Sequence, residues 1–244
     1  MELINGNILN LTSLWTTVGK QVGAFSEDQV FSKVSTHKGQ WPNKLWTLQA
    51  LDRATISQAK SIMQASPVKL SIPYWDHSGS EGLQLLEKEG FVLSSEQIGM
   101  SLKLDKAYAL TEGFTIEKVT DERSAYLWSS LFKQAFSYEI HHALLLPAYD
   151  KTEFLIAGYQ EEYIGTGILH YTENQIAGIH SMGVLRNQRR KGFAENMMKE
   201  MLNKALRTGC EYSTLQASPM GKGLYLKLGF REQFTQYNFE IAKQ

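Results

Sequence analysis

The chain has 244 residues, with 25 Lys and Arg against 25 Asp and Glu, so its formal net charge is zero. This length allows one large domain or two small ones, each with its own core. Hydrophobic residues make up 43% and charged residues 20%, which excludes a disordered chain. The charge balance argues against a protein that binds nucleic acid through bulk charge, so we expect no nucleic-acid partner. The single cysteine cannot form an internal disulfide and is too few for a thiolate metal site.

The beginning of the chain has no basic segment followed by an apolar stretch, so we expect no signal peptide. No apolar run approaches the roughly 18 residues that are needed to span a bilayer. Together with the unpaired cysteine, these features predict a cytoplasmic protein without a membrane partner.

In the first half, residues 83–89 read as a helix that ends at Gly90, followed by Phe91 and a strand. Residues 98–104 alternate apolar and polar side chains, as a half-buried strand does. A polar stretch follows at 105–113. We therefore predict a boundary near residue 110, which divides the chain into residues 1–110 and 111–244.

The second half has a clear order of elements. A cap at 120–122 precedes a helix with apolar residues at helical spacing from Ala125 to Phe136. Short gaps between the next three strands predict an antiparallel meander. The expected elements are strands at 153–159, 163–171 and 175–184, a long helix at 194–206, a strand at 212–217, a short helix at 221–228 and a last strand at 236–241. This order predicts an α+β fold with a mixed, mostly antiparallel sheet and helices on its faces.

The two halves end alike. In each, a helix is followed by a glycine, a phenylalanine and a final strand: Gly90-Phe91 in the first half and Gly229-Phe230 in the second. This similarity favours a diverged internal repeat, although helix–Gly–Phe–strand is also common by chance. Leu86 stands where the repeat would place the tyrosine of the second half.

A basic segment joins the third strand of the meander to the long helix. Arg186, Arg189, Arg190 and Lys191 lie together, and no acidic residue occurs between Asn174 and Ala194. A helix N-terminus offers free backbone N–H groups and the positive end of its dipole, and Gly192 and Ala194 allow close approach. These features suit a pyrophosphate. A solvated basic surface is the alternative.

Two motifs resemble those of the GNAT N-acetyltransferases. Arg189-x-x-Gly192-x-Ala194, between a strand and a helix, is similar to the family's acyl-CoA pyrophosphate motif, and Leu224–Phe230 resembles its last, tyrosine-containing helix. The order of elements from Phe114 to Ile241 also resembles that family, so the resemblance covers the second half. It implies a GNAT-like catalytic domain at 111–244 and, through the repeat, a diverged and non-catalytic GNAT-like domain at 1–110.

The resemblance implies direct transfer of an acyl group, usually acetyl, from CoA to an amine. The residues that it places at the cofactor are Met182, Val184, Gln188, Arg189, Arg190, Lys191, Gly192, Phe193, Ala194 and Ser218. Many family members have Asn at the position of Ser218, and the resemblance implies that the serine hydroxyl replaces that amide as a hydrogen-bonding group for the cofactor. Met182 and Val184, which would polarise the thioester through their backbone, are otherwise ordinary core residues.

Tyr225 is the expected general acid for the leaving thiolate, because a phenol is neutral and donates its O–H at pH 7; a core aromatic is the alternative. His180 is the candidate base, against a structural histidine or a water relay. Adjacent His141 and His142 do not easily bind one metal, so we expect no metal cofactor.

The expected activity is therefore an acyltransferase that uses acetyl-CoA, or another acyl-CoA, and a small-molecule or peptide amine. Two alternatives stay open: a non-catalytic acyl-CoA binding or sensing protein, and an aminoacyl or peptidyl transferase on a related double fold. The second is disfavoured because a charged tRNA donor calls for an extended basic stripe. The sequence also leaves open a homodimer.

Overall fold

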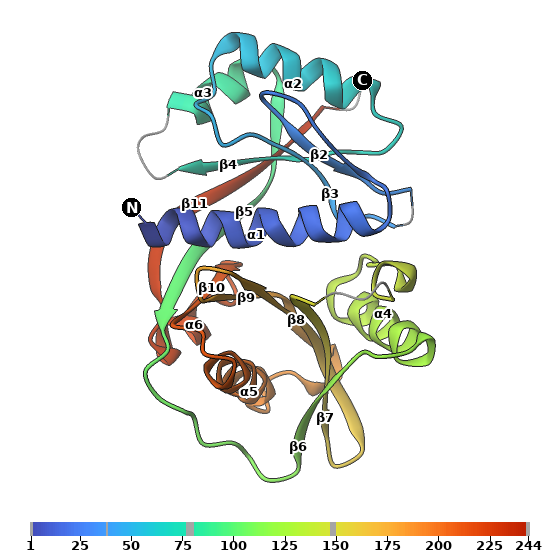
Figure 1. Ribbon diagram of the computed structural model, residues 1–244, viewed down its shortest axis with the longest axis vertical. Helices are drawn as coiled ribbons and strands as arrows, with labels where there is room; N and C mark the ends of the chain where they lie inside the picture. Colours follow the sequence, from blue (N-terminus) through green and yellow to red (C-terminus); the bar gives the residue numbers. More distant parts are fainter. Residues whose placement is uncertain (1, 38, 77–80, 147–149, 243–244) are drawn as a thin grey trace.

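The computed structural model describes residues 2–37, 39–76, 81–146 and 150–242. An eight-stranded sheet carries helices on both faces, and a three-stranded sheet lies beside it (Figure 1). The elements of the first half are α1 (Glu2–Gln21), β1 (Phe25–Glu27), β2 (Ser32–Ser35), β3 (Asn43–Trp46), α2 (Arg53–Ala65), β4 (Ile72–Asp76), α3 (Glu81–Lys88) and β5 (Phe91–Lys103). Those of the second half are β6 (Phe114–Lys118), α4 (Glu122–Phe136), η1 (His142–Leu144), β7 (Thr152–Tyr159), β8 (Glu162–Thr172), β9 (Ile176–Val184), η2 (Arg186–Gln188), α5 (Phe193–Arg207), β10 (Tyr212–Ala217), α6 (Lys222–Leu228) and β11 (Arg231–Ile241).

The large sheet has the strand order β4-β11-β5-β10-β9-β8-β7-β6. In the part of the chain that the structure describes, β9 and β10 are its one parallel pair, and every other neighbouring pair is antiparallel. The predicted meander is present as β7, β8 and β9. The predicted α+β class with a mixed, mostly antiparallel sheet is confirmed.

The last strands of the two halves change places. β5 pairs with β10 of the second half, and β11 pairs with β4 of the first half. β5 and β11 also pair with each other, so each half supplies a strand to the other's part of the sheet. Phe239 of β11 is fully buried in a first-half cluster with Ile72 and Leu86. The predicted boundary near residue 110 falls in the segment 104–113, which has no helix or strand; because the sheet continues across it, the division into two domains stays a prediction.

Alternation along β7 shows how the two faces of the sheet are covered. Phe154 and Ile156 pack with apolar residues of α1 and α4. Leu155 and Ala157 point to the opposite face, where they join clusters that include α5. Consequently α1 of the first half and α4 of the second half share one face, and α5 and α6 cover the other. Figure 1 shows α1 running between the two halves.

The endings of the two halves are alike in three dimensions. Gly90 and Gly229 both adopt the left-handed conformation, with φ +85° and +98°, which glycine reaches without steric cost. Phe91 and Phe230 are both buried. Leu86 is fully buried, so the position that would hold a tyrosine in the first half is part of its core.

Two strands are longer than the sequence predicts. β5 begins at Phe91 rather than near 98, and β11 begins at Arg231 rather than at 236. Residues 92–96 of β5 are exposed, Val92 and Leu93 included, so this part of the strand has no buried side and depends on backbone pairing with β11. Register shifts interrupt the alternation of β11 at Glu232/Phe234 and Asn238/Phe239.

None of the described helices, the 20-residue α1 included, is long and apolar enough to cross a membrane.

Candidate active site

The candidate site begins where β9 and β10 stop pairing. Residues 212–214 of β10 pair with 176–178 of β9. Beyond them, residues 179–184 of β9 and 215–217 of β10 form no ladder with each other in the described chain. We call these two strand ends the second-half fork. Because the ladder between the two strands stops here, backbone N–H groups on their facing edges can bind an extended ligand.

A β-bulge in β9 lies at the fork. On β8, Gly167 faces two residues of β9, Ser181 and Met182, and Ser181 has a φ of +48°. A bulge bends its strand and increases the local twist, which carries β9 away from β10. β8 and β9 remain in close contact, because a Cβ added to Gly165 would overlap the carbonyl oxygen of Gly183.

The loop between β9 and α5 presents unpaired backbone donors. In the described chain, the N–H groups of residues 189–194 form no hydrogen bond, whereas the N–H of Glu195 already reaches Gly192 O at 3.1 Å. Arg190 and Gly192 have φ values of +64° and +81°. Alternating conformations of this kind turn successive N–H groups toward one concave surface that suits an anion. A Cβ at Gly192 would meet no atom within 4 Å, so the space beside it is open.

The basic side chains of this loop have different environments. Arg189 donates from Nε to Val184 O at 3.1 Å and from Nη2 to Ala135 O at 2.9 Å, so it ties the end of β9 to α4. Lys191 Nζ donates to Gln188 Oε1 at 2.9 Å. Arg190 is exposed and forms no hydrogen bond or ion pair with the rest of the described chain. Arg189 therefore shapes the loop, and Arg190 is the cation available to a ligand.

An ion-pair network joins α5 to α6. Glu195, in the first turn of α5, lies 2.8 Å from Lys199 Nζ and 2.5 Å from Lys227 Nζ of α6. Hydrogen bonds from Lys199 and then from Lys227 hold the pKa of Glu195 below its usual value. The network keeps the helix that carries Tyr225 beside the start of α5.

Tyr225 and Ser218 lie at the other side of the fork. The Tyr225 ring packs edge-on against Phe230, with 5.9 Å between centroids. Burial raises the pKa of Tyr225 to about 12, so its phenol is protonated at neutral pH. Ser218 is exposed at the end of β10, and its Oγ accepts the N–H of Gly221 at 3.2 Å. Ser218 thus lies just before the start of α6 and Tyr225 lies on that helix, so both are next to the end of β10.

His180 is enclosed rather than open to the fork. It is 8% exposed, and its Nε2 lies 2.9 Å from Asn10 Oδ1 of α1. Asn10 Nδ2 donates to the carbonyls of His170 and Ile176, so its oxygen accepts from the His180 ring. Burial, then the nearby His170, lowers the pKa of His180 to about 3. Such a weakly basic, occupied imidazole favours a structural role over the predicted role as general base.

Two further residues, which are not among the predicted site residues, reach the fork from α1. Asn7 and Asn10 are fully buried. Asn7 Oδ1 accepts from Gln216 Nε2 of β10 at 2.7 Å, and Asn7 Nδ2 donates to Met100 O of β5 at 3.1 Å. The sequence does contain a signal for them: two asparagines lie three residues apart in a largely apolar helix. A buried amide needs hydrogen-bond partners, so such a pair indicates polar contacts with another element.

Several of the predicted cofactor residues are brought together. Met182, Val184, Phe193 and Ala194 pack in one apolar cluster, and Met182 also packs in the cluster that contains Tyr225. The fork, the start of α5 and α6 are therefore one continuous region, with Gln188–Gly192 along its margin. The ligand contacts assigned to these residues stay predictions.

Comparisons with known proteins identify the family of this region. Residues 119–230 match the model of the acetyltransferase (GNAT) family. Residues 119–230 form a GNAT acetyltransferase domain. No curated protein matches the chain in sequence.

Solved structures extend the likeness to the GNAT fold over the whole chain. A GCN5-related N-acetyltransferase from Kribbella flavida has a TM-score of 0.74 and 13% identity, over 98% of this chain and 97% of that one. A tandem GNAT protein from the clavulanic acid biosynthesis pathway has a TM-score of 0.60 and 11% identity, over 98% and 96% of the two chains. At such identities these matches show the fold alone. They confirm the GNAT-like fold of the second half and show that the likeness in fold extends over the first half.

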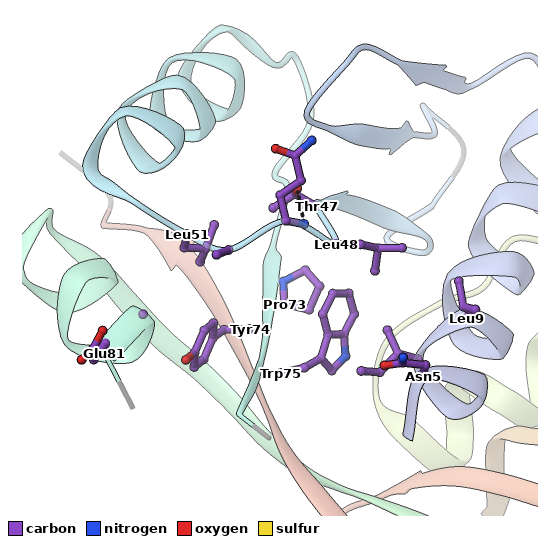
Figure 2. Close-up of a pocket in the computed structure, with 13 residues that line it drawn as sticks. Asn5, Leu9, Thr47, Leu48, Leu51, Pro73, Tyr74, Trp75 and Glu81 are labelled. Carbon is purple, nitrogen blue, oxygen red and sulfur yellow. Dashed lines mark hydrogen bonds between the residues drawn. The ribbon is translucent and has the colours of Figure 1, made fainter. Parts of the chain in front are cut away.

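A cavity of about 590 Å³ lies in the first half (Figure 2). The fork is the candidate site, because the unpaired amides and the family match are there. No group of three or more His, Cys, Asp or Glu side chains that could hold a metal occurs among the described residues.

Proposed function

We propose that the second half transfers an acyl group, acetyl in the first instance, from acyl-CoA directly to the amine of a small molecule or peptide. The observation that carries this proposal is the run of unpaired N–H groups at residues 189–194, set at the start of α5 beside the fork. The open space at Gly192 and the exposed Arg190 fit a pyrophosphate at this position.

Acyl-CoA supplies an activated thioester, and the chain supplies its orientation and the proton transfers. The N–H groups of 189–194 bind the pyrophosphate, with Arg190 adding charge. The backbone at Met182 and Val184 holds the pantetheine arm along the fork and polarises the thioester carbonyl. Ser218 retains a hydroxyl hydrogen that it can donate at the end of β10.

Tyr225 donates its phenolic proton to the departing thiolate. A pKa of about 12 keeps that proton in place at neutral pH until the leaving group needs it. The acceptor's ammonium must lose a proton before attack. Since His180 is buried and only weakly basic, water carries this proton away.

Titration calorimetry with acetyl-CoA tests the cofactor site. Gly192→Asp places a side chain and a negative charge against the pyrophosphate, and Gly209→Asp is its matched control. Gly192 and Gly209 share a φ of +81°, and a Cβ on either meets nothing within 4 Å. We expect about a tenfold or greater loss of affinity in the first variant alone, because charge-assisted contacts contribute about 1.5–3 kcal/mol each.

Equal affinities of the two folded variants for acetyl-CoA would show that the loop 189–194 does not bind the cofactor. A second assay measures thiol release from acetyl-CoA with a panel of amines. If the protein binds acetyl-CoA but releases no thiol with any amine, it is an acyl-CoA binding protein rather than an enzyme.

A further inference from the structure

The first half contains a fork of its own. β3 and β4 are parallel and meet through Leu45 N to Ser71 O at 3.0 Å and Ser71 N to Asn43 O at 3.2 Å. In the described chain, β3 and β4 pair only where β4 begins, just as β9 and β10 pair only over their first residues. The connecting helix α2 corresponds to α5, and the helix after β4, α3, corresponds to α6. The first half therefore repeats the geometry that, in the second half, opens the cofactor site.

The cavity of about 590 Å³ lies at the open end of this first-half fork. Its walls come from the loop after β3, from β4, and from the starts of α1 and α3 (Figure 2). This volume is within the range of about 300–1,000 Å³ that is usual for small-molecule sites. Apolar and aromatic side chains and one carboxylate give the cavity its chemical character: Leu9, Leu48, Leu51, Tyr74, Trp75 and Glu81.

The charges around the cavity exclude the ligand of the second half. Residues 47–52, which correspond to the basic loop 185–192, contain no Lys or Arg. Instead, Asp52 caps α2, accepting the N–H of Thr55 at 2.8 Å. Backbone and side-chain hydrogen bonds from Thr55 lower the pKa of Asp52, so its carboxylate is ionised at neutral pH. A carboxylate therefore stands at the N-cap of α2, the position that Gly192 holds at α5, and its charge would repel a pyrophosphate there.

The walls suit an apolar body with a positive charge. Figure 2 shows Trp75 between Leu48 and Asn5, and Tyr74 with its hydroxyl toward the side on which Glu81 lies. Trp75 Nε1 donates to Gln236 Oε1 at 2.9 Å, which fixes the orientation of its ring. Aromatic faces attract cations, and Glu81 adds a negative charge at the rim. We propose that this cavity binds a small organic amine with an apolar or aromatic body, and not an acyl-CoA.

This cavity is separate from the proposed acyl-transfer site. Asn5 and Leu9 of α1 line it, whereas Asn7 and Asn10 lie on the opposite side of the same helix and bind the second half. α1 therefore forms a wall between the two sites. The amine site does not depend on acyl transfer in the second half, and its test measures binding rather than turnover.

The indole N–H signal of Trp75 in a ¹H–¹⁵N NMR spectrum reports on the cavity. Trp75→Phe identifies this signal among those of the five tryptophans. The probes are phenethylamine, 2-phenylethanol and 3-phenylpropanoate, which differ in charge, and coenzyme A. We expect millimolar phenethylamine to shift the signal most and 3-phenylpropanoate least.

Variants of exposed residues test the source of this selectivity. Glu81→Gln should weaken phenethylamine binding by roughly fivefold, the upper range for an exposed ion pair, and leave 2-phenylethanol unchanged. Glu87→Gln, exposed on the same helix but away from the cavity, is the matched control. Leu9→Lys should also weaken the amine, because it adds a cation to the wall; Leu9 is 47% exposed, so the fold tolerates the change.

Three results would overturn the proposal. One is no shift of Trp75 with any of the amine or alcohol probes at millimolar concentration. Another is equal binding of all three charge types, or no difference between Glu81→Gln and its control. The third is a shift by coenzyme A that exceeds that by phenethylamine and persists in Gly192→Asp, where the second-half site is blocked.

Discussion

Acidification should destabilise this protein through His180, and His180→Gln should remove that part of the effect. His180 is enclosed between β9 and α1, with Nε2 bound to Asn10. Protonation would place a positive charge in this buried site, and the free-energy cost of burying that charge lowers the pKa of His180 to about 3. Glutamine retains an N–H donor for Asn10 but does not titrate.

The expected size follows from the two protonation equilibria. In the unfolded chain His180 has its ordinary pKa of 6.5, and in the folded chain a pKa of about 3. Between these values the unfolded state binds more protons, so the free energy of unfolding falls as the pH falls. From pH 7 to pH 5 this loss amounts to about 2 kcal/mol for one such group. Burial also lowers the pKa of His170, to about 4. His170 therefore causes a similar loss of unfolding free energy, and His180→Gln retains that loss.

Urea unfolding at pH 7, 6 and 5, followed by tryptophan fluorescence, measures this difference. The wild type should lose about 2 kcal/mol more than His180→Gln over this range. His37→Gln removes an exposed histidine and should behave like the wild type. Parallel pH dependences of the wild type and His180→Gln would refute the burial argument and reopen a role for His180 as a base.

Further predictions concern catalysis, the loop, the sheet and the alkaline range. Tyr225→Phe should lower kcat by roughly 10²-fold with little change in acetyl-CoA affinity, and an unchanged kcat where chemistry limits the rate would exclude Tyr225 as the acid. Arg190→Gln should weaken acetyl-CoA binding without changing the melting temperature, whereas Arg189→Gln should lower the melting temperature because it loses two carbonyl contacts; calorimetry of both variants checks this. A fragment of residues 111–244 should be insoluble, because it lacks β5 between β10 and β11; a monodisperse fragment in size-exclusion chromatography would contradict this. Desolvation lowers the pKa of the half-buried Lys44 to about 8, so the wild type should gain about 2 kcal/mol of unfolding free energy from pH 8 to 10, and Lys44→Met should lose this gain in denaturant titrations.

The second-half elements could be predicted because their signals are local. Helical spacing from Ala125 to Phe136 corresponds to α4, and the strand at 212–217 coincides with β10. The left-handed Gly229 ends α6 where its sequence position indicates. These features depend on neighbouring residues and on one buried face, which a single sequence displays.

The strand exchange could not be predicted in this way. β5 and β11 find their partners through backbone hydrogen bonds between residues more than 100 positions apart. Side-chain alternation indicates which face of a strand is buried, but not which strand lies beside it.

The same limit applied at the candidate site. The motif around Arg189 and Gly192 indicated the loop, but its sequence did not show that the Arg189 side chain turns back to Val184 and Ala135. His180 looked available because histidine titrates near neutral pH. Its burial depends on Asn10, which is 170 residues away in the chain.

The exchange of β5 and β11 also constrains how the protein can be made. While the ribosome is still adding the second half, β4 and the early part of β5 have emerged, but β11, which pairs with both, has not. The nascent first half therefore exposes strand edges until residue 241 leaves the exit tunnel. Its large sheet can close only once β11 is available, and such long-range pairing makes folding slow and sensitive to aggregation or chaperone supply.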